Sequence, residues 1–421
     1  MSFSVLVLFI RPTIPLRFHC DGDFICKIWH WRPLDEGAFV LDHIPITHGA
    51  IELYNFWTTE LSSHFFADFE TQRRNIQQMQ TALTVIRSPL RSFVLEDNAT
   101  FYTIGLEKTQ LDVISFGTRC NVETLKINYC KLKQLPESIS NLKALKIFTL
   151  SHSFIQVVDL NLLAELPRLT LLDLSKNRLH TLYDSSAGTA TLSYPLLADL
   201  YLRENKLKHI NLDVFRPMES LTRIDLSHNQ ISVVSGSLVS ASLNLLDLSN
   251  NRIVEMDCCG WAVPMLYGMD ANDNRLRALP KCLEQAFLNV VRLAFDSNQL
   301  QPDVMFQFGR LTSLKFLTLT DNKLPYVTLN MSTIPKQLRH LNLSHNKIKH
   351  LDVPYAPSKD FHIDVSSNCI SSVDWDRVSA NLTKLGMGEN PLDCSFHSIS
   401  TRADIRSKLV CKRHRIEHCD L

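Results

Sequence analysis

The segment LTRIDLSHNQI occupies residues 221–231, and the segment LNLLDLSNNRI occupies residues 243–253. Both follow the pattern L-x-x-L-x-L-x-x-N-x-L, with Ile replacing Leu at some positions. The same pattern fits residues 169–179, 196–207, 314–324 and 338–348. Such self-similarity at a fixed period predicts a stack of like supersecondary units.

Weaker copies extend this register toward both ends of the chain. Counting them, the Asn place recurs fourteen times between residues 88 and 390, at intervals of 21 to 28 residues. The longest interval, between Asn177 and Asn205, contains the small polar tract DSSAGTATLS, which predicts a surface loop. In the four earliest copies other residues stand in the Asn place: Ser88, Thr109, Cys130 and Ser153.

Each L-x-L triplet predicts a short strand, because successive side chains of a strand point to opposite faces. The two Leu side chains then point inward and the middle residue points to solvent. Strands of consecutive repeats are expected to pair in parallel, about 4.8 Å apart. An inward Asn can satisfy backbone groups where the chain leaves the strand. The pattern therefore predicts an α/β solenoid whose stability comes from stacking of neighbouring repeats.

Composition narrows the function. The 421 residues carry 44 Lys and Arg against 43 Asp and Glu, and a net charge of +1 argues against nucleic acid as the main partner. Only 12 residues are Gly, which leaves little material for phosphate-binding loops. The common nucleotide-binding, hydrolase and zinc-protease motifs are absent. We predict no enzymatic activity, no catalytic residue, no metal and no cofactor.

The outward residues of the L-x-L triplets predict a protein-binding face. Asp225, Asp247 and Asp270 come from consecutive repeats and should stand side by side. Charges of both signs favour a protein partner over a polyanion. The alternative is a solvated row of acidic side chains without a ligand, because the sequence L-D-L-S is common in repeats of this type. A broad face without a deep pocket disfavours small molecules. The candidate binding residues are Asp173, Tyr201, Arg203, Arg223, Asp225, Asp247, Asp270 and Arg292.

Eleven cysteines cluster toward the ends of the chain. Because an open solenoid needs covered ends, we predict disulfide caps, and the odd number leaves at least one thiol that could link a second chain. Zinc is the alternative at the C-terminal end, where Cys411, His414, His418 and Cys419 have suitable residue types. The candidates for disulfides are Cys20, Cys26, Cys394, Cys411 and Cys419.

Other cysteines lie within the repeats. Cys130, in an Asn place, is expected to be a reduced structural residue. Pairing of Cys258 or Cys259 with Cys282 stays open, whereas the adjacent pair is unsuited to bond to itself because the geometry is strained.

The start of the chain contains FSVLVLFI at residues 3–10, of signal-peptide length. Residues 1–19 are a candidate signal peptide, with a buried strand or a misplaced start codon as alternatives. Residues 20–80 are rich in aromatics and predict an N-terminal cap containing one degenerate repeat. No segment reaches 18 apolar residues, so we expect no membrane span. Candidate glycosylation sites are Asn98, Asn330, Asn342 and Asn381.

Residues from about 80 to 392 resemble the leucine-rich repeat family of the extracellular type, on the period of about 24 residues and the N-x-L pattern. NPLDC at 390–394, followed by Cys411 and Cys419, resembles the C-terminal cap of secreted members. The resemblance implies a horseshoe with a parallel concave β-sheet of about 14 repeats and Cys-containing caps, with repeats at 81–392 and a cap at 393–421.

The chain is also similar to mosquito leucine-rich immune proteins, whose long members partner a complement-like thioester protein. Those members continue into a coiled coil, whereas this sequence stops at Leu421, so a member without the coiled coil or a truncated form is the expected match. The resemblance implies a secreted recognition or scaffold protein of insect innate immunity that binds a complement-like or other immune protein. The alternative is an intracellular, cytoplasmic leucine-rich repeat regulatory or scaffold subunit with reduced cysteines.

Overall fold

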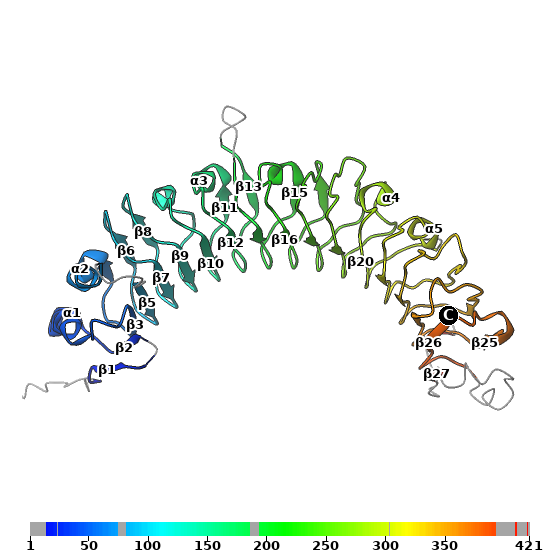
Figure 1. Cartoon of the computed structure of the whole chain (residues 1–421), viewed down its shortest axis with the longest axis horizontal. Helices are drawn as coiled ribbons and strands as arrows, with labels where there is room; N and C mark the ends of the chain where they lie inside the picture. The colour runs from blue at the N-terminus through cyan, green and yellow to red at the C-terminus, as the bar shows by residue number, and fades with distance from the viewer. Residues whose placement is uncertain are drawn as a thin grey trace, which may run out of the picture. The chain divides into compact units, whose positions relative to one another are not determined.

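The computed structural model describes residues 14–22, 24–74, 81–185, 193–302, 304–392, 409–410 and 419. The chain forms two compact units. Unit 1 comprises Met1–Ile155 with Glu165–Pro167, and unit 2 comprises Gln156–Ala164 with Arg168–Leu421. Each unit has a parallel sheet built from one short strand per repeat (Figure 1).

The sheet of unit 1 begins with an antiparallel hairpin between β1 (Arg17–Cys20) and β2 (Ile25–Trp29). Every later pairing in this sheet is parallel, in the order β2, β3 (Ala50–Tyr54), β5 (Ala82–Ile86), β7 (Thr103–Glu107), β9 (Thr124–Asn128) and β10 (Ile147–Ser151). On the other side of the repeats a second parallel sheet contains β4 (Glu60–Ser62), β6 (Ser92–Leu95) and β8 (Val113–Phe116). The helical segments are α1 (Pro33–Glu36), η1 (Phe39–His43), η2 (Ser63–Phe66), α2 (Ala67–Arg74) and η3 (Glu137–Asn141).

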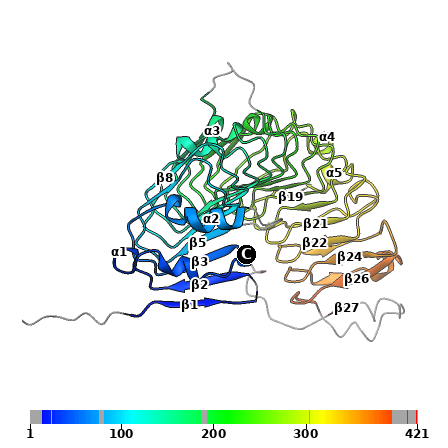
Figure 2. The same ribbon diagram turned by 60° about the vertical axis from the view of Figure 1, so that its left-hand side comes forward.

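The sheet of unit 2 is parallel throughout its described strands (Figure 2). Its order is β12 (Leu171–Asp173), β14 (Asp199–Tyr201), β16 (Arg223–Asp225), β18 (Leu245–Asp247), β19 (Gly268–Asp270), β20 (Arg292–Ala294), β21 (Phe316–Thr318), β22 (His340–Asn342), β24 (Phe361–Asp364), β26 (Leu382–Gly386) and β27 (Leu409–Val410).

Shorter elements connect these strands of unit 2. Pairs of parallel strands form between β11 (Val157–Asp159) and β13 (Thr181–Tyr183), β15 (His209–Asn211) and β17 (Val233–Ser235), and β23 (His350–Leu351) and β25 (Ser372–Val373). The helical segments are α3 (Leu160–Ala164), η4 (Leu212–Phe215), α4 (Leu283–Ala286), α5 (Met305–Phe308) and η5 (Trp375–Arg377).

The strands place the repeat's Leu positions in register inside the solenoid. Ile224 of β16 pairs with Leu246 of β18, which pairs with Met269 of β19. None of these three side chains is more than 3% exposed. Because each is covered only by the repeats beside it, the core is a continuous row of aliphatic layers. The predicted repeat solenoid with a parallel sheet is confirmed.

The backbone turns in the same way after every strand of the repeat. The residue before each of the fourteen Asn places has a positive φ, between 51° and 58°. A non-glycine residue in this left-handed region costs roughly 1–2 kcal/mol, so the turn needs compensation. His152, His228 and His345 hold this position in three repeats, which explains why histidines recur there on the turn.

The buried Asn side chain supplies that compensation. Asn251 donates from Nδ2 to the carbonyl oxygens of Leu226, at 3.0 Å, and of Leu248, at 3.1 Å, and its Oδ1 accepts from the backbone N of Ile231 at 2.9 Å. It therefore bonds to its own repeat and to the preceding one. Where Asn is replaced, the smaller groups keep part of this network: the Ser88 hydroxyl donates to the Phe56 carbonyl.

Two further repeats lie in residues 20–80. His30 and Asn55 have φ values of 61° and 51°, and they precede Trp31 and Phe56, which are fully buried in the Asn place. The ring centroids of Trp31 and Phe56 lie 5.3 Å apart. The sequence predicts only one degenerate repeat in this segment, because bulky aromatic rings fill the space by packing and leave no Asn to mark the register.

Candidate functional site

The strands of unit 2 present two rows of side chains on the open face of the sheet, which we define by the first and third residues of β14 to β21. In the third-residue row, Asp225 pairs in register with Asp247, and Asp247 with Asp270. The first-residue row runs through Arg223, Leu245, Gly268, Arg292 and Phe316. The predicted row of three neighbouring carboxylates is therefore present.

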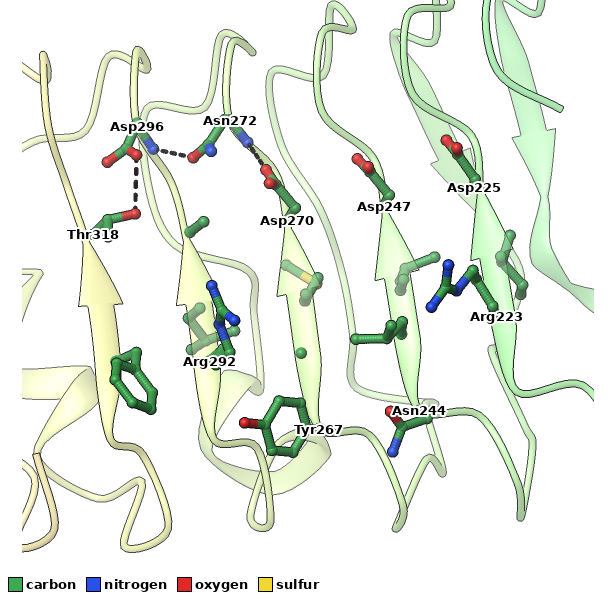
Figure 3. Close-up of a pocket in the computed structure, with 18 of the residues that line it drawn as sticks. Arg223, Asp225, Asn244, Asp247, Tyr267, Asp270, Asn272, Arg292, Asp296 and Thr318 are labelled. Atoms are coloured by element: carbon green, nitrogen blue, oxygen red, sulfur yellow. Dashed lines mark hydrogen bonds between the residues drawn. The ribbon is translucent and has the colours of Figure 1, made fainter. Parts of the chain in front are cut away.

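A hollow of about 670 Å³ lies on this open face. Figure 3 shows Asp225, Asp247, Asp270 and Asp296 along one edge of it. Tyr267 and Asn244 lie along the opposite edge, and Arg223 and Arg292 extend from that side toward the middle of the hollow. The hollow therefore has an acidic rim and a rim with two cations.

The acidic rim is held by hydrogen bonds from the turn that follows each strand. Asp247 Oδ1 accepts from the backbone N of Ser249 at 2.9 Å and from its hydroxyl at 2.7 Å. Asp225 makes the same pair of bonds with Ser227. Among the described residues, Asp270 accepts from the backbone N of Asn272 alone, at 2.9 Å, because an Asn stands where the other two repeats have Ser. The recurring D-x-S sequence thus stabilises the turn after the strand, and Asp270 lacks the hydroxyl donor that Ser supplies to Asp225 and Asp247.

Two carboxylates on this rim hold their protons more tightly than usual. Burial raises the pKa of Asp270 to about 6, against the lowering effect of the Asn272 N–H, and the charges of Asp247, Asp296 and Asp273 raise it further. Burial likewise raises the pKa of Asp296. Their ionised forms are therefore costly in the empty hollow.

The cationic rim is only loosely paired. Arg223 Nε lies 3.9 Å from Asp199 Oδ1, and its Nη1 donates to the Tyr201 hydroxyl at 3.4 Å. The guanidinium of Arg292 lies 5.7 Å from the centre of the Phe316 ring, which stacks on His340 at 5.1 Å. Both guanidiniums keep donors that face the hollow or solvent, since neither forms a bidentate pair with a described carboxylate.

Comparisons with known proteins agree with this architecture. Sequence models of the family described as "Leucine rich repeat" match residues 120–179 and 195–253, and a second one matches residues 337–357. The chain contains leucine-rich repeats and has the leucine-rich repeat solenoid fold. The APL1 leucine-rich repeat domain aligns over 92% of this chain and 97% of its own, with a TM-score of 0.53 and 16% identity. The resemblance to mosquito leucine-rich immune proteins is supported at the level of the fold.

Curated relatives share part of the repeat array. Osteomodulin of Bos taurus is 28% identical over 257 residues, which cover 58% of this chain and 57% of that protein. Mimecan of Coturnix japonica is 33% identical over 153 residues, covering 36% of this chain and 43% of that protein. The chain spans about half the length of these curated relatives.

The leucine-rich repeat fold brings most of the predicted binding residues together. Tyr201, Arg223, Asp225, Asp247, Asp270 and Arg292 all line the hollow. Asp173 lies one strand further along, on β12 in register with Tyr201, and Arg203 is exposed beyond the end of β14; neither lines the hollow. The sequence predicted a broad face without a deep pocket, so the hollow was not expected, and Gly268, Tyr267 and Phe316 were not among the candidates. Arg223 and Arg292 already marked the outward position at the start of the strand, and the same position in the other repeats was the available signal.

The cysteines pair in three bonds among the described residues: Cys20–Cys26, Cys259–Cys282 and Cys369–Cys419. The first ties the β1–β2 hairpin at the end of the unit 1 sheet. The last ties Cys419 to Cys369, which lies in a repeat and was not among the predicted disulfide candidates. Because Cys419 is bonded in this way, it cannot bind zinc as a free thiolate in the alternative zinc site. Cys394, Cys411, His414 and His418 lie outside the described residues.

The free thiols that the structure describes are Cys120, Cys130 and Cys258, and all three are buried. Burial raises the pKa of each. Such thiols are poor nucleophiles and cannot reach a second chain without local opening. A disulfide-linked oligomer would therefore need a cysteine other than these three.

The four candidate glycosylation sites differ in exposure. Asn98 and Asn381 are exposed, whereas Asn330 and Asn342 are half-buried. Asn342 lies on the strand face, and its Oδ1 accepts from the backbone N of Ser344 at 3.0 Å. Among the described residues, no helix is both long and apolar enough to span a bilayer.

Proposed function

We propose that this leucine-rich repeat protein is a secreted, non-enzymatic recognition or scaffold protein that binds another protein through the open face of unit 2. One observation carries the proposal: the hollow of about 670 Å³ whose rims carry opposite charges. Complementary charge on a partner would fix its register and speed its encounter.

The polar groups of the hollow are suited to binding rather than to chemistry. The carboxylates of Asp225 and Asp247 are hydrogen-bonded to the turns of their own repeats. The acidic rim would repel a polyanion. A face spread over several strands, with loosely paired Arg223 and Arg292, matches the mixed charge of a protein surface.

Three disulfides among the described residues support secretion, because such bonds persist in oxidising compartments. Exposed acceptor sequences at Asn98 and Asn381 are compatible with it. The resemblance to mosquito immune proteins extends the proposal to insect innate immunity, with a complement-like thioester protein as the first partner to test.

The secretion proposal is tested by expression in insect cells and mass mapping without reduction. We expect the protein in the medium, with peptides linked through Cys20–Cys26 and glycans at Asn98 or Asn381. Retention in cells, with every thiol free and no glycan, would instead support the intracellular regulatory subunit.

The binding face is tested by co-purification with a complement-like thioester protein from insect cell medium. We expect Asp225→Arg with Asp247→Arg to abolish co-purification. The variant should also melt at a lower temperature, because it loses four hydrogen bonds to the turns of its repeats. Asp364→Arg is the matched control, since Asp364 holds the same place in its repeat and bonds the same type of turn, but does not line the hollow. Co-purification that survives the double variant would move the interface to another surface.

A further inference from the structure

The floor of the hollow has a gap where one repeat lacks a side chain. Gly268 is flanked in register by Leu245 on β18 and by Arg292 on β20. With strands about 4.8 Å apart, these two neighbours stand roughly 10 Å from each other, so one side chain is missing from the row. A Cβ added at Gly268 would lie 3.2 Å from Leu245 Cδ2 and 3.7 Å from Arg292 Cβ. Gly268 itself is buried, and Leu245 lies against it, so the gap is shallow and is bordered by the aliphatic side chain of Leu245.

The gap continues toward the acidic rim. Ala294, the neighbour of Asp270 on β20, is also small, and Thr318 follows it on β21. Along β19 the distance from Gly268 to Asp270 is two residues, or roughly 6.6 Å. This length matches the aliphatic stem of a long basic side chain, which can lie on an apolar surface while its charge is solvated at the end.

The end of the gap carries paired negative charge. Asp247 and Asp270 are in register on adjacent strands, and Asp270 has an oxygen that lacks the seryl donor found at Asp225 and Asp247. A planar guanidinium can donate to two carboxylates at once. Tyr267, at the near end of the gap, is 39% exposed and offers a ring to the stem.

From this geometry we propose that the hollow is a receptor for one arginine side chain of the protein partner, whose stem lies over Gly268 and Leu245 and whose guanidinium binds Asp247 and Asp270. Arg292 borders the gap on β20, and Arg223 stands one strand beyond Leu245 on the other side, so the residues next to that arginine in the partner are acidic. The proposal rests on the proposed function and specifies the chemistry of the same face.

The charge balance of the hollow supports this occupant. In the empty hollow, ionised Asp270 faces Asp247, Asp296 and Asp273. A bound guanidinium would offset that repulsion and lower the pKa of Asp270. Binding would therefore weaken as the pH falls from 7.5 to 5.5, where Asp270 takes up its proton.

The probe is a random 12-residue peptide library displayed on phage and selected on the immobilised full chain. We expect the selected sequences to contain Arg flanked by Asp or Glu. A synthetic copy of one selected peptide should lose at least tenfold in affinity when its Arg is replaced by citrulline, which keeps the shape and removes the charge. Selected sequences without Arg, or equal binding of the citrulline peptide, would overturn the proposal.

Two variants locate the peptide. Gly268→Leu fills the gap, and Asp247→Asn with Asp270→Asn removes the charge while keeping a turn acceptor of the kind that Asn342 provides. We expect each to lower the affinity at least tenfold, and Asp364→Asn to leave it unchanged. Gly268→Leu should melt close to the wild type, and the double Asn variant should melt no lower than the wild type. The second variant keeps the test decisive if Gly268→Leu fails to fold.

The outcomes separate the receptor from the proposed function. Peptides that bind Gly268→Leu normally but lose binding to Asp225→Arg with Asp247→Arg would leave the open face as the interface and refute the arginine gap. Peptides that bind all variants equally would refute both.

Discussion

Replacing Asp270 with Asn should stabilise the protein at neutral pH and leave it unchanged in acid. The folded pKa of Asp270 is about 6, against an ordinary value of 3.8. Below pH 3.8 both the folded and unfolded states hold the proton, so the residue has no effect on stability. Between pH 3.8 and 6 only the folded state holds it, so stability falls as the pH rises. Above pH 6 the cost of the buried charge is constant.

The size of the effect follows from this pKa difference. A difference of about 2 units corresponds to roughly 3 kcal/mol at 1.36 kcal/mol per unit. Part of the carboxylate still contacts water, and screening reduces the figure, so we expect about 1–2 kcal/mol. The hydrogen bond from Asn272 survives in the variant because an Asn side chain keeps an oxygen, as Asn342 shows in the same place of another repeat.

The assay is urea unfolding of the oxidised full chain at pH 3.5, 5.5 and 7.5. We expect the Asp270→Asn variant and the wild type to coincide at pH 3.5 and to differ by about 1–2 kcal/mol at pH 7.5. Asp173→Asn is the control, since Asp173 has the same turn but faces Tyr201 rather than another aspartate. A stability difference that does not change with pH, or a less stable variant at pH 7.5, would refute the reasoning.

Two further predictions concern the scaffold. Asn251→Ala removes the hydrogen bonds to the Leu226 carbonyl and from the Ile231 N–H and leaves both groups buried. It should therefore lower the free energy of unfolding in urea by about 3 kcal/mol, whereas Asn251→Ser should lower it by roughly half as much. Equal losses for the two variants would contradict this. Cys259→Ser with Cys282→Ser opens a loop of 23 residues. It should lower the free energy of unfolding by about 3 kcal/mol, measured in urea against the wild type without reductant. An unchanged denaturation midpoint would count against that disulfide.

The sequence was most informative where a repeat depends on its own residues. The L-x-L alternation predicted the strands, and the Asn places marked fourteen turns that all contain a left-handed residue. The same reasoning failed at Trp31 and Phe56, because packing of aromatic rings replaces the hydrogen bonds that make Asn necessary. It predicted that Asp225, Asp247 and Asp270 would be neighbours, since in-register stacking follows from the period.

Other features depended on distances that no repeat specifies alone. The pairing of Cys369 with Cys419 joins residues 50 positions apart, and the hollow arises because Gly268 and Ala294 happen to stand between the larger residues of other strands. The raised pKa of Asp270 likewise comes from burial and from charges on neighbouring repeats. The sequence by itself determined the repeat, its turns and the residues that face outward, because these follow from local backbone geometry. Only the tertiary structure decided which of those residues meet, how deep the face is and which charges are costly, because these depend on how side chains from different repeats pack side by side.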